Sequence, residues 1–256
     1  MVRNAPCKLC GKTAKLLKRS HIIPNFMYKG MFDDLNRMVT ADLASNLANP
    51  RFQQTGFSEK YILCSKCDNE LLGKLEKYTS VVLFGGKSKS PLFFESAYGP
   101  DGGKSIIIRN LDYVKFKLCI LSILWRAHHS KHNFFKKIEL QQDAEVIRRM
   151  LLDNEAPDET IFKISIIVVK NSEGLLRMVV DPNIIELGQG RVAIFLINGL
   201  FYFIEVKADS GFATFRNHFL RNEGVCEVLL IEGKQAKSFL DAYGLPVSLT
   251  DYYFST

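Results

Sequence analysis

The sequence lacks long hydrophobic runs and the compositions that mark disordered chains. Its longest predominantly apolar stretch, Leu118–Trp125, has eight residues including a serine, whereas a membrane-spanning helix needs about 20. The first residues, MVRNAPCKLCGK, have no apolar core of a secretory signal. Proline is scarce, at 8 of 256 residues, and 47% of the chain is hydrophobic, which excludes collagen-like and disordered classes. We therefore expect a globular, cytoplasmic protein without a membrane partner.

Acidic residues are scarce in the first part of the chain. Residues 1–110 carry 17 Lys/Arg and 9 Asp/Glu, a net charge of +8, whereas residues 111–256 carry 17 and 18, a net charge of −1. This asymmetry favours a polyanionic partner, and we expect nucleic acid ahead of a membrane surface. A basic face that meets only solvent is the alternative. The residues expected to contact phosphates are Lys12, Lys15, Lys18 and Arg19.

Glycine and proline cluster over residues 85–104, which predicts a linker between two domains. The first domain is expected over residues 1–84, where residues 26–58 show little periodicity and are interpreted as a long loop. The second domain is expected over residues 105–256. Its pattern of helices and strands predicts an α+β fold with two helices and an antiparallel sheet.

The second domain contains clear periodic segments. Helices are predicted over about 112–130 and 141–152, with a shorter one at 236–243. Strands are predicted over 162–169, 175–180, 192–197, 201–206 and 225–231. An Asn-Gly pair at 198–199, between two apolar runs, predicts a tight β-hairpin.

The six cysteines indicate a metal site rather than disulfides, because the chain carries no secretory signal. Four of them form two pairs with two-residue spacers, Cys7 with Cys10 and Cys64 with Cys67. Such a spacer lets both thiolates of a pair face one ion, so the pairs predict a single tetrahedral, structural zinc site. Two unrelated redox pairs are the alternative, although neither pair lies in a βαβ unit. The remaining cysteines lie in apolar runs and are expected to be core residues, namely Cys119 and Cys226.

Three features follow one another within residues 7–78: a CxxC pair, a His-Ile-Ile-Pro segment at 21–24, and a Leu-Cys-x-x-Cys segment that leads into a predicted helix from Cys67. This combination resembles the zinc-knuckle branch of the HNH endonuclease superfamily. The resemblance implies a small treble-clef-like ββα-metal domain in which the cysteines hold zinc. It also implies hydrolysis of phosphodiester bonds in DNA or RNA, and such nucleases often serve in phage defence.

The resemblance assigns the role of general base to His21, which would activate a water molecule. An imidazole suits this role because its ordinary pKa is about 6.5. The family places a metal ligand directly after the last cysteine, and Asp68 matches it as an oxygen ligand for catalytic Mg²⁺ or Mn²⁺. The chain departs from the family at two positions, where Ser20 replaces a metal ligand and Glu59 replaces an asparagine.

These departures leave a second hypothesis open. Asn46 and Asn49 are nearby substitutes for the missing asparagine, but neither matches by spacing. Glu76 follows Asp68 by eight residues, about 12 Å along a helix, which is too far for the two to share a metal ion. The second hypothesis is that the domain is a non-catalytic zinc-binding module for nucleic acid or a protein partner. In that case His21 anchors the hairpin of the domain.

The second domain carries no catalytic pattern. His128 and His132 have the i, i+4 spacing of a metal pair, but histidines at a helix end more often face the helix dipole. Arg126 is expected either to contact substrate or to pair within the fold. We expect this domain to bind a protein partner or to close a homo-oligomer, and a regulatory sensor for a ligand is a further hypothesis.

Overall fold

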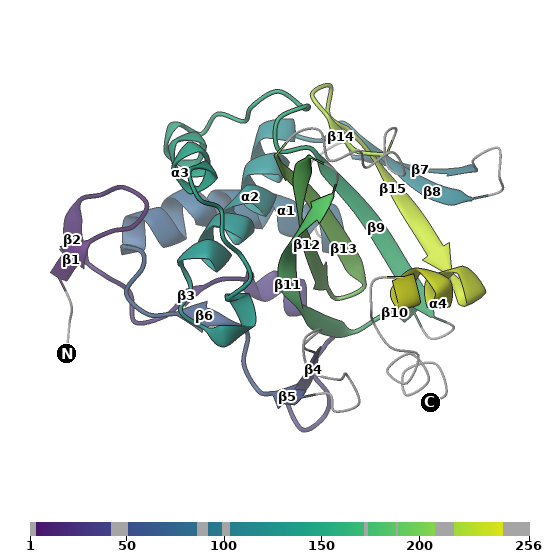
Figure 1. Ribbon diagram of the computed structural model, residues 1–256, viewed down its shortest axis with the longest axis horizontal. Coiled ribbons are helices and arrows are strands. Elements are labelled where there is room, and N and C mark those ends of the chain that lie inside the picture. The colour runs from purple at the N-terminus through teal and green to yellow at the C-terminus, as the bar shows by residue number, and fades with distance from the viewer. Residues whose placement is uncertain are drawn as a thin grey trace.

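The structure of the protein is a computed structural model that describes residues 4–41, 51–85, 92–98, 103–171, 174–187, 189–207 and 218–242. Short strands and the helix α1 make up the N-terminal part, with β1 and β2 at the left of Figure 1 and β4 and β5 at the bottom. In chain order these elements are β1 (Asn4–Pro6), β2 (Thr13–Lys15), β3 (Ser20–His21), the 3-10 turn η1 (Asn25–Tyr28), β4 (Met38–Ala41), β5 (Arg51–Gln53), β6 (Ser58–Glu59), the π-helical turn η2 (Lys66–Leu72) and α1 (Gly73–Phe84).

The rest of the chain supplies most of the sheet and three helices. These elements are β7 (Phe93–Tyr98), β8 (Lys104–Arg109), α2 (Tyr113–His129), the 3-10 turn η3 (Asn133–Phe135), α3 (Asp143–Asp153), β9 (Ile164–Asn171), β10 (Gly174–Leu175), β11 (Met178–Leu187), β12 (Gly190–Ile197), β13 (Leu200–Lys207), β14 (Leu220–Arg221), β15 (Val225–Glu232) and α4 (Gly233–Ala242). The predicted helices and strands of this part are confirmed within a few residues, with one exception, and residue 243 lies outside the described residues. The strand predicted over 175–180 covers the end of β10 and the first residues of β11, which continues to Leu187.

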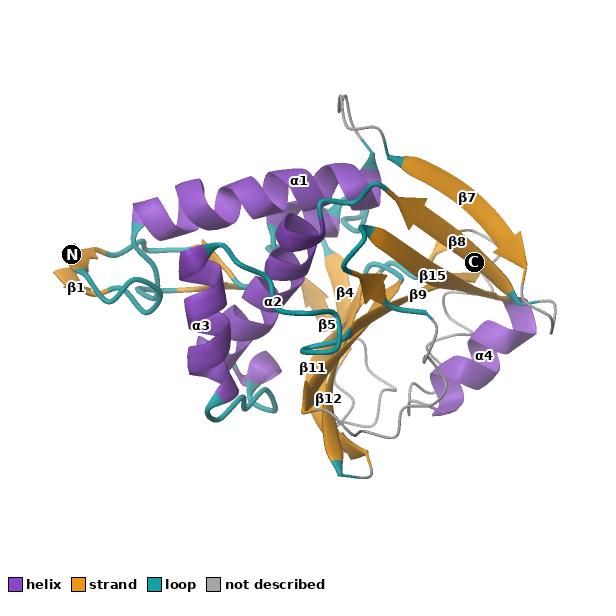
Figure 2. Ribbon diagram, turned by 90° about the horizontal axis from the view of Figure 1, so that it is seen from above, coloured by secondary structure: helices purple, strands orange, loops and turns teal. Residues whose placement is uncertain are grey.

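One curved sheet of 11 strands forms the body of the molecule (Figure 2). Its main path runs β5-β4-β11-β12-β13-β9-β15-β8-β7, with β10 beside β9 and β14 beside β15. Most pairs are antiparallel, but β4 pairs with β11 and β9 pairs with β15 in parallel. The α+β class is confirmed, and the expected antiparallel sheet is a mixed one.

The central strands bury both faces of the sheet, because successive side chains point to opposite sides. Ile166 and Tyr202 face the core that contains α1, α2 and α3. Ile167 and Phe201 face the other side, where Ala236 of α4 packs on them. The sheet therefore separates a large core, which includes the N-terminal elements, from a smaller one under α4.

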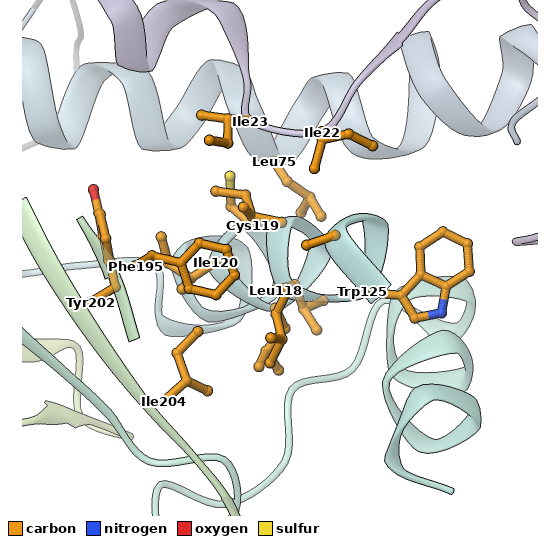
Figure 3. Packing of buried hydrophobic residues seen from close by; sticks show 14 of the residues in the cluster. Ile22, Ile23, Leu75, Leu118, Cys119, Ile120, Trp125, Phe195, Tyr202 and Ile204 are labelled. Carbon is orange, nitrogen blue, oxygen red and sulfur yellow. The ribbon is translucent and has the colours of Figure 1, made fainter. Parts of the chain in front are cut away.

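Helix α2 is buried on every side from Phe116 to Ala127. Figure 3 shows that this helix lies between two groups of side chains, with those of the N-terminal part on one side and those of the sheet on the other. The labelled residues include Ile22, Ile23 and Leu75 from the N-terminal part, and Phe195, Tyr202 and Ile204 from the sheet. The sequence pattern predicts only one apolar face for this helix, whereas the structure encloses all of its faces.

This packing corrects the expected division of the chain. The linker predicted over residues 85–104 is wrong for Phe93–Tyr98, which forms β7 and pairs with β8, while 86–91 and 99–102 lie outside the described residues. The loop predicted over residues 26–58 contains β4, which joins the large sheet beside β11. A single core therefore spans the expected boundary between residues 1–84 and 105–256.

Local signals explain where two key elements begin and turn. The Asp112 side chain accepts a hydrogen bond of 3.0 Å from the Lys115 amide and so caps the N-terminus of α2. Asn198 and Gly199 have φ values of 53° and 77°, as the tight turn between β12 and β13 requires.

Among the described residues, we find no helix with the length and apolar character needed to cross a membrane.

Asn198 also connects distant parts of the chain, and its removal is a test of the shared core. Its amide Nδ2 donates to the carbonyls of Met27 and Lys29, at 3.2 and 3.0 Å. We expect Asn198→Ala to lower the free energy of unfolding by about 2 kcal/mol more than Asn36→Ala, because buried carbonyls lose their donor. Asn36 is a matched control, since it has the same positive φ but is exposed. Equal losses in denaturant titrations would contradict the proposed connection.

Candidate metal centre and the His21 cluster

The two cysteine pairs converge on one point. The sulfur atoms of Cys7, Cys10, Cys64 and Cys67 all lie within 4.8 Å of one another. A tetrahedral zinc ion with Zn–S bonds of about 2.3 Å places its sulfurs about 3.8 Å apart, so the cluster has the size that one ion needs. None of the six cysteines forms a disulfide. The cluster can hold a metal ion, and the alternative of two unrelated redox pairs does not match this convergence.

Backbone hydrogen bonds bring the two pairs together. The Cys7 amide donates to Lys12 O and the Gly11 amide to Cys7 O, which closes the first loop, and Gly11 has a φ of 73°. The Lys8 amide donates to Ile62 O, which holds this loop against the segment that enters η2. The Cys64 amide donates to the Cys7 sulfur at 3.4 Å.

The protonation of these thiols depends on their surroundings. Burial raises the pKa of the Cys7 and Cys67 thiols above the ordinary value. Burial also raises the pKa of the Cys10 thiol. Hydrogen bonds from the Lys12 amide and the neighbouring sulfurs outweigh this effect, so that the pKa is lowered overall. A bound cation would therefore have to displace protons from buried thiols, as zinc does when it binds thiolates.

The second polar group of interest surrounds His21. Strand β3 pairs with β6 so that Ser20 lies opposite Glu59 and His21 opposite Ser58. The helical segment η2–α1 follows β6 in the chain and contributes Asp68. The structure thus brings Asp68 close to Ser20 and His21, from which it is separated by 48 and 47 positions in the sequence.

The titration of this group is shifted by burial and by nearby charges. Burial lowers the pKa of His21 below its ordinary value of 6.5, although the carboxylates of Glu76 and Asp68 act in the opposite direction. Burial raises the pKa of Asp68, and the Arg126 guanidinium partly offsets this effect. A histidine and a carboxyl group with shifted pKa values at one place are typical of functional sites.

Arg126 of α2 is the residue that sequence reasoning left undecided, and the structure pairs it within the fold. Its guanidinium is 1% exposed and donates from Nη1 to the His21 carbonyl at 2.7 Å and to Glu76 Oε1 at 2.8 Å. Its remaining nitrogens donate to the Ser122 carbonyl and hydroxyl. No local signal marked this residue, because its partners lie 50 and 105 positions away in the sequence.

The donors around His21 do not form a ready-made site for Mg²⁺ or Mn²⁺. Across the described residues, the four cysteines are the only group of three or more Cys, His, Asp or Glu side chains whose ligand atoms converge. The Glu76 carboxylate is already neutralised by Arg126. The buried Ser20 hydroxyl forms no hydrogen bond of good geometry within the described part of the chain, but it lies near enough to Asp68 to lower the pKa of that carboxyl group. The expectation of a metal ion on Asp68 stays a prediction.

The remaining residues singled out from the sequence have separate environments. Glu59 does not face His21 but accepts hydrogen bonds from the Ser130 hydroxyl and the Lys131 amide. His128 accepts a hydrogen bond from the Leu140 amide, and His132 accepts one from the Phe134 amide. Neither histidine is part of a metal-binding group.

Asn46 and Asn49 lie outside the described residues. The four basic residues expected to contact phosphates are all exposed, namely Lys12, Lys15, Lys18 and Arg19. Cys119 and Cys226 are fully buried, as expected.

Comparison with known proteins adds no relative. No family model, no curated protein and no solved structure matches this chain.

Removal of one cysteine tests the metal centre. We expect the purified protein to contain one zinc ion per chain and Cys64→Ser to lose it, because three thiolates and a hydroxyl bind zinc less tightly. The matched control is Cys226→Ala, which removes a buried cysteine outside the cluster and should keep the metal. Elemental analysis of both variants decides the matter, and full zinc occupancy in Cys64→Ser would overturn the assignment.

The buried guanidinium gives a separate prediction about stability. Replacement Arg126→Met leaves the Glu76 carboxylate and the His21 carbonyl without their donor, and we expect a loss of about 3–5 kcal/mol in the free energy of unfolding. Arg149→Met on the surface of α3 removes the same charge and should cost less than about 0.5 kcal/mol. Urea titration measures both, and similar losses would show that Arg126 does not have this role.

Proposed function

We propose that the protein is a zinc-stabilised, HNH-like endonuclease that hydrolyses phosphodiester bonds of DNA, with His21 as the general base. The observation that carries this proposal is the cluster of His21, Asp68, Glu76 and Arg126 at the junction of the β3–β6 strand pair and the helix that follows β6. Two paired strands followed by a helix support the ββα-metal resemblance, with η1, β4 and β5 inserted between the two strands. The cysteine cluster beside them supports zinc as the structural metal, because four thiolates are a typical zinc ligand set.

The environment of His21 suits proton transfer at neutral pH. Because its pKa is lowered, the imidazole is neutral at pH 7 and can accept a proton from an attacking water molecule. The proton then resides on the imidazole, where the negative charges of Asp68 and Glu76 stabilise it. Arg126 holds the backbone of His21 through its carbonyl and so fixes the position of the base.

Exposed basic residues would hold the substrate close to this base. Lys18 and Arg19 directly precede β3, and they are exposed. Ammonium and guanidinium groups at such positions bind backbone phosphates without reading the base sequence. If a divalent cation takes part, Asp68 is the carboxylate that would hold it, since Glu76 is bound to Arg126.

A second function has its own support. The guanidinium of Arg126 already supplies a positive charge beside the two carboxylates, and Ser20 stands where the family has a metal ligand. These two features favour a non-catalytic, zinc-binding module that binds nucleic acid or a protein partner and retains His21 for structure.

A cleavage assay separates the two functions. We expect the zinc-loaded protein to nick plasmid DNA and His21→Ala to reduce the rate at least 100-fold, since general-base catalysis contributes about 10²–10⁴. The assay is run in parallel with Mg²⁺, with Mn²⁺ and with EDTA, on plasmid, single-stranded DNA and RNA. His218→Ala, at the other end of the chain near β14, is the matched control and should leave the rate unchanged.

The pH profile gives an independent check of the base. A neutral imidazole is active and a protonated one is not, so the rate should fall as the pH drops through the His21 pKa, which lies below 6.5. Binding of DNA without cleavage, unchanged in His21→Ala, would overturn the nuclease and support the binding module.

A further inference from the structure

A cavity of about 680 Å³ lies between the first cysteine loop, strand β6 and the C-terminal end of α2. Its size is within the range of ligand pockets, about 300–1,000 Å³. Cys7 and Lys8 form one wall, and Glu59 to Ile62 form another. His129, the last residue of α2, and Lys131, just beyond it, close the cavity. The His21 side chain does not line this cavity, so it is separate from the cluster described above.

The charge of this cavity is positive. Lys8, Lys60 and Lys131 come from three separate segments, and none of their ammonium groups forms an ion pair within the described ranges. Glu59 is the only acidic residue in the lining, and its carboxylate is occupied by the Lys60 amide, the Lys131 amide and the Ser130 hydroxyl. Burial alone would raise the pKa of Glu59, but these hydrogen bonds hold it below the ordinary value. The lysines are therefore available for an anion from outside.

Two ring side chains complete the lining. Tyr61 has a φ of 60°, a strained conformation for a bulky residue, and its amide donates to Leu17 O at 2.9 Å. His129 packs edge-on against Trp125, and its pKa is lowered to about 4 by burial, by His128 and by Lys8. His129 is consequently neutral at pH 7, and its ring N–H can donate to a phosphate oxygen.

We propose that this cavity binds a nucleotide, with its phosphate on Lys60 and Lys131 and its base against Tyr61. Ammonium groups bind phosphates well, and aromatic rings stack on nucleobases of any sequence. The same chemistry serves a free nucleotide and a nucleotide within a nucleic-acid strand, and the test distinguishes these sources. The proposal does not require His21 to be catalytic.

The test measures binding to the zinc-loaded, full-length His21→Ala protein, so that a strand cannot be cleaved during the experiment. The probes are inorganic phosphate, adenosine monophosphate and a fluorescent single-stranded DNA of about 12 nucleotides, a length within known site sizes. The variant Lys60→Ala/Lys131→Ala removes two charges away from the cysteines. The control Lys77→Ala/Lys136→Ala removes two exposed lysines that do not line the cavity.

We expect adenosine monophosphate to bind more tightly than phosphate, and the double variant to weaken its binding at least tenfold while the control leaves it unchanged. Tyr61→Leu should weaken the nucleotide but not phosphate. If both the nucleotide and the DNA bind, and both bind more weakly to the variants, the cavity accepts free nucleotides as well as strands. If only the DNA binds, and binds more weakly to the variants, the cavity is a site for strands. Equal effects of the variant and the control, no binding of any probe, or measurable binding of phosphate and nucleotide with equal affinity would overturn the proposal.

Discussion

The enclosure of helix α2 on all sides is the constraint from which the rest of the structure follows. A helix in this position must bury its polar side chains as well, and each of them needs partners inside the protein. Lys117 donates to the Tyr113 hydroxyl and to two backbone carbonyls, and burial lowers its pKa to about 8. Arg126 reaches the opposite side and finds the His21 carbonyl and Glu76. The two long cations thereby attach separate parts of the chain to one helix.

The position of Arg126 explains why the His21 cluster differs from a simple metal site. Two carboxylates beside a half-buried histidine need a compensating positive charge, and at many phosphodiester-cleaving sites a divalent cation supplies it. In this protein a covalently tethered guanidinium lies there, fully withdrawn from solvent. Because this charge is part of the chain, its contribution to the electrostatic field at His21 is built into the fold.

The sequence predicts the local features of this protein well and its long-range features poorly. The spacing of the cysteines is sufficient to predict the sulfur cluster, because metal geometry limits how four thiolates can be arranged. The Asn-Gly turn and helix α2 are likewise local signals. The pairing of β4 with β11 and the contact of Arg126 with His21 join residues more than 100 positions apart, and no pattern in either segment specifies its partner. Burial around all of α2 is also invisible, since three polar residues interrupt its apolar pattern.

The N-terminal part therefore depends on the remainder of the chain for the geometry of its candidate site. The β3–β6 strand pair has only two residue pairs, which is too little to hold its shape alone. Arg126 of α2 binds the His21 carbonyl, and Ser130 and Lys131, which directly follow α2, bind the Glu59 carboxylate. The C-terminal part of α2 and the two residues after it therefore hold both strands of this pair, and Lys131 also lines the lysine-lined cavity.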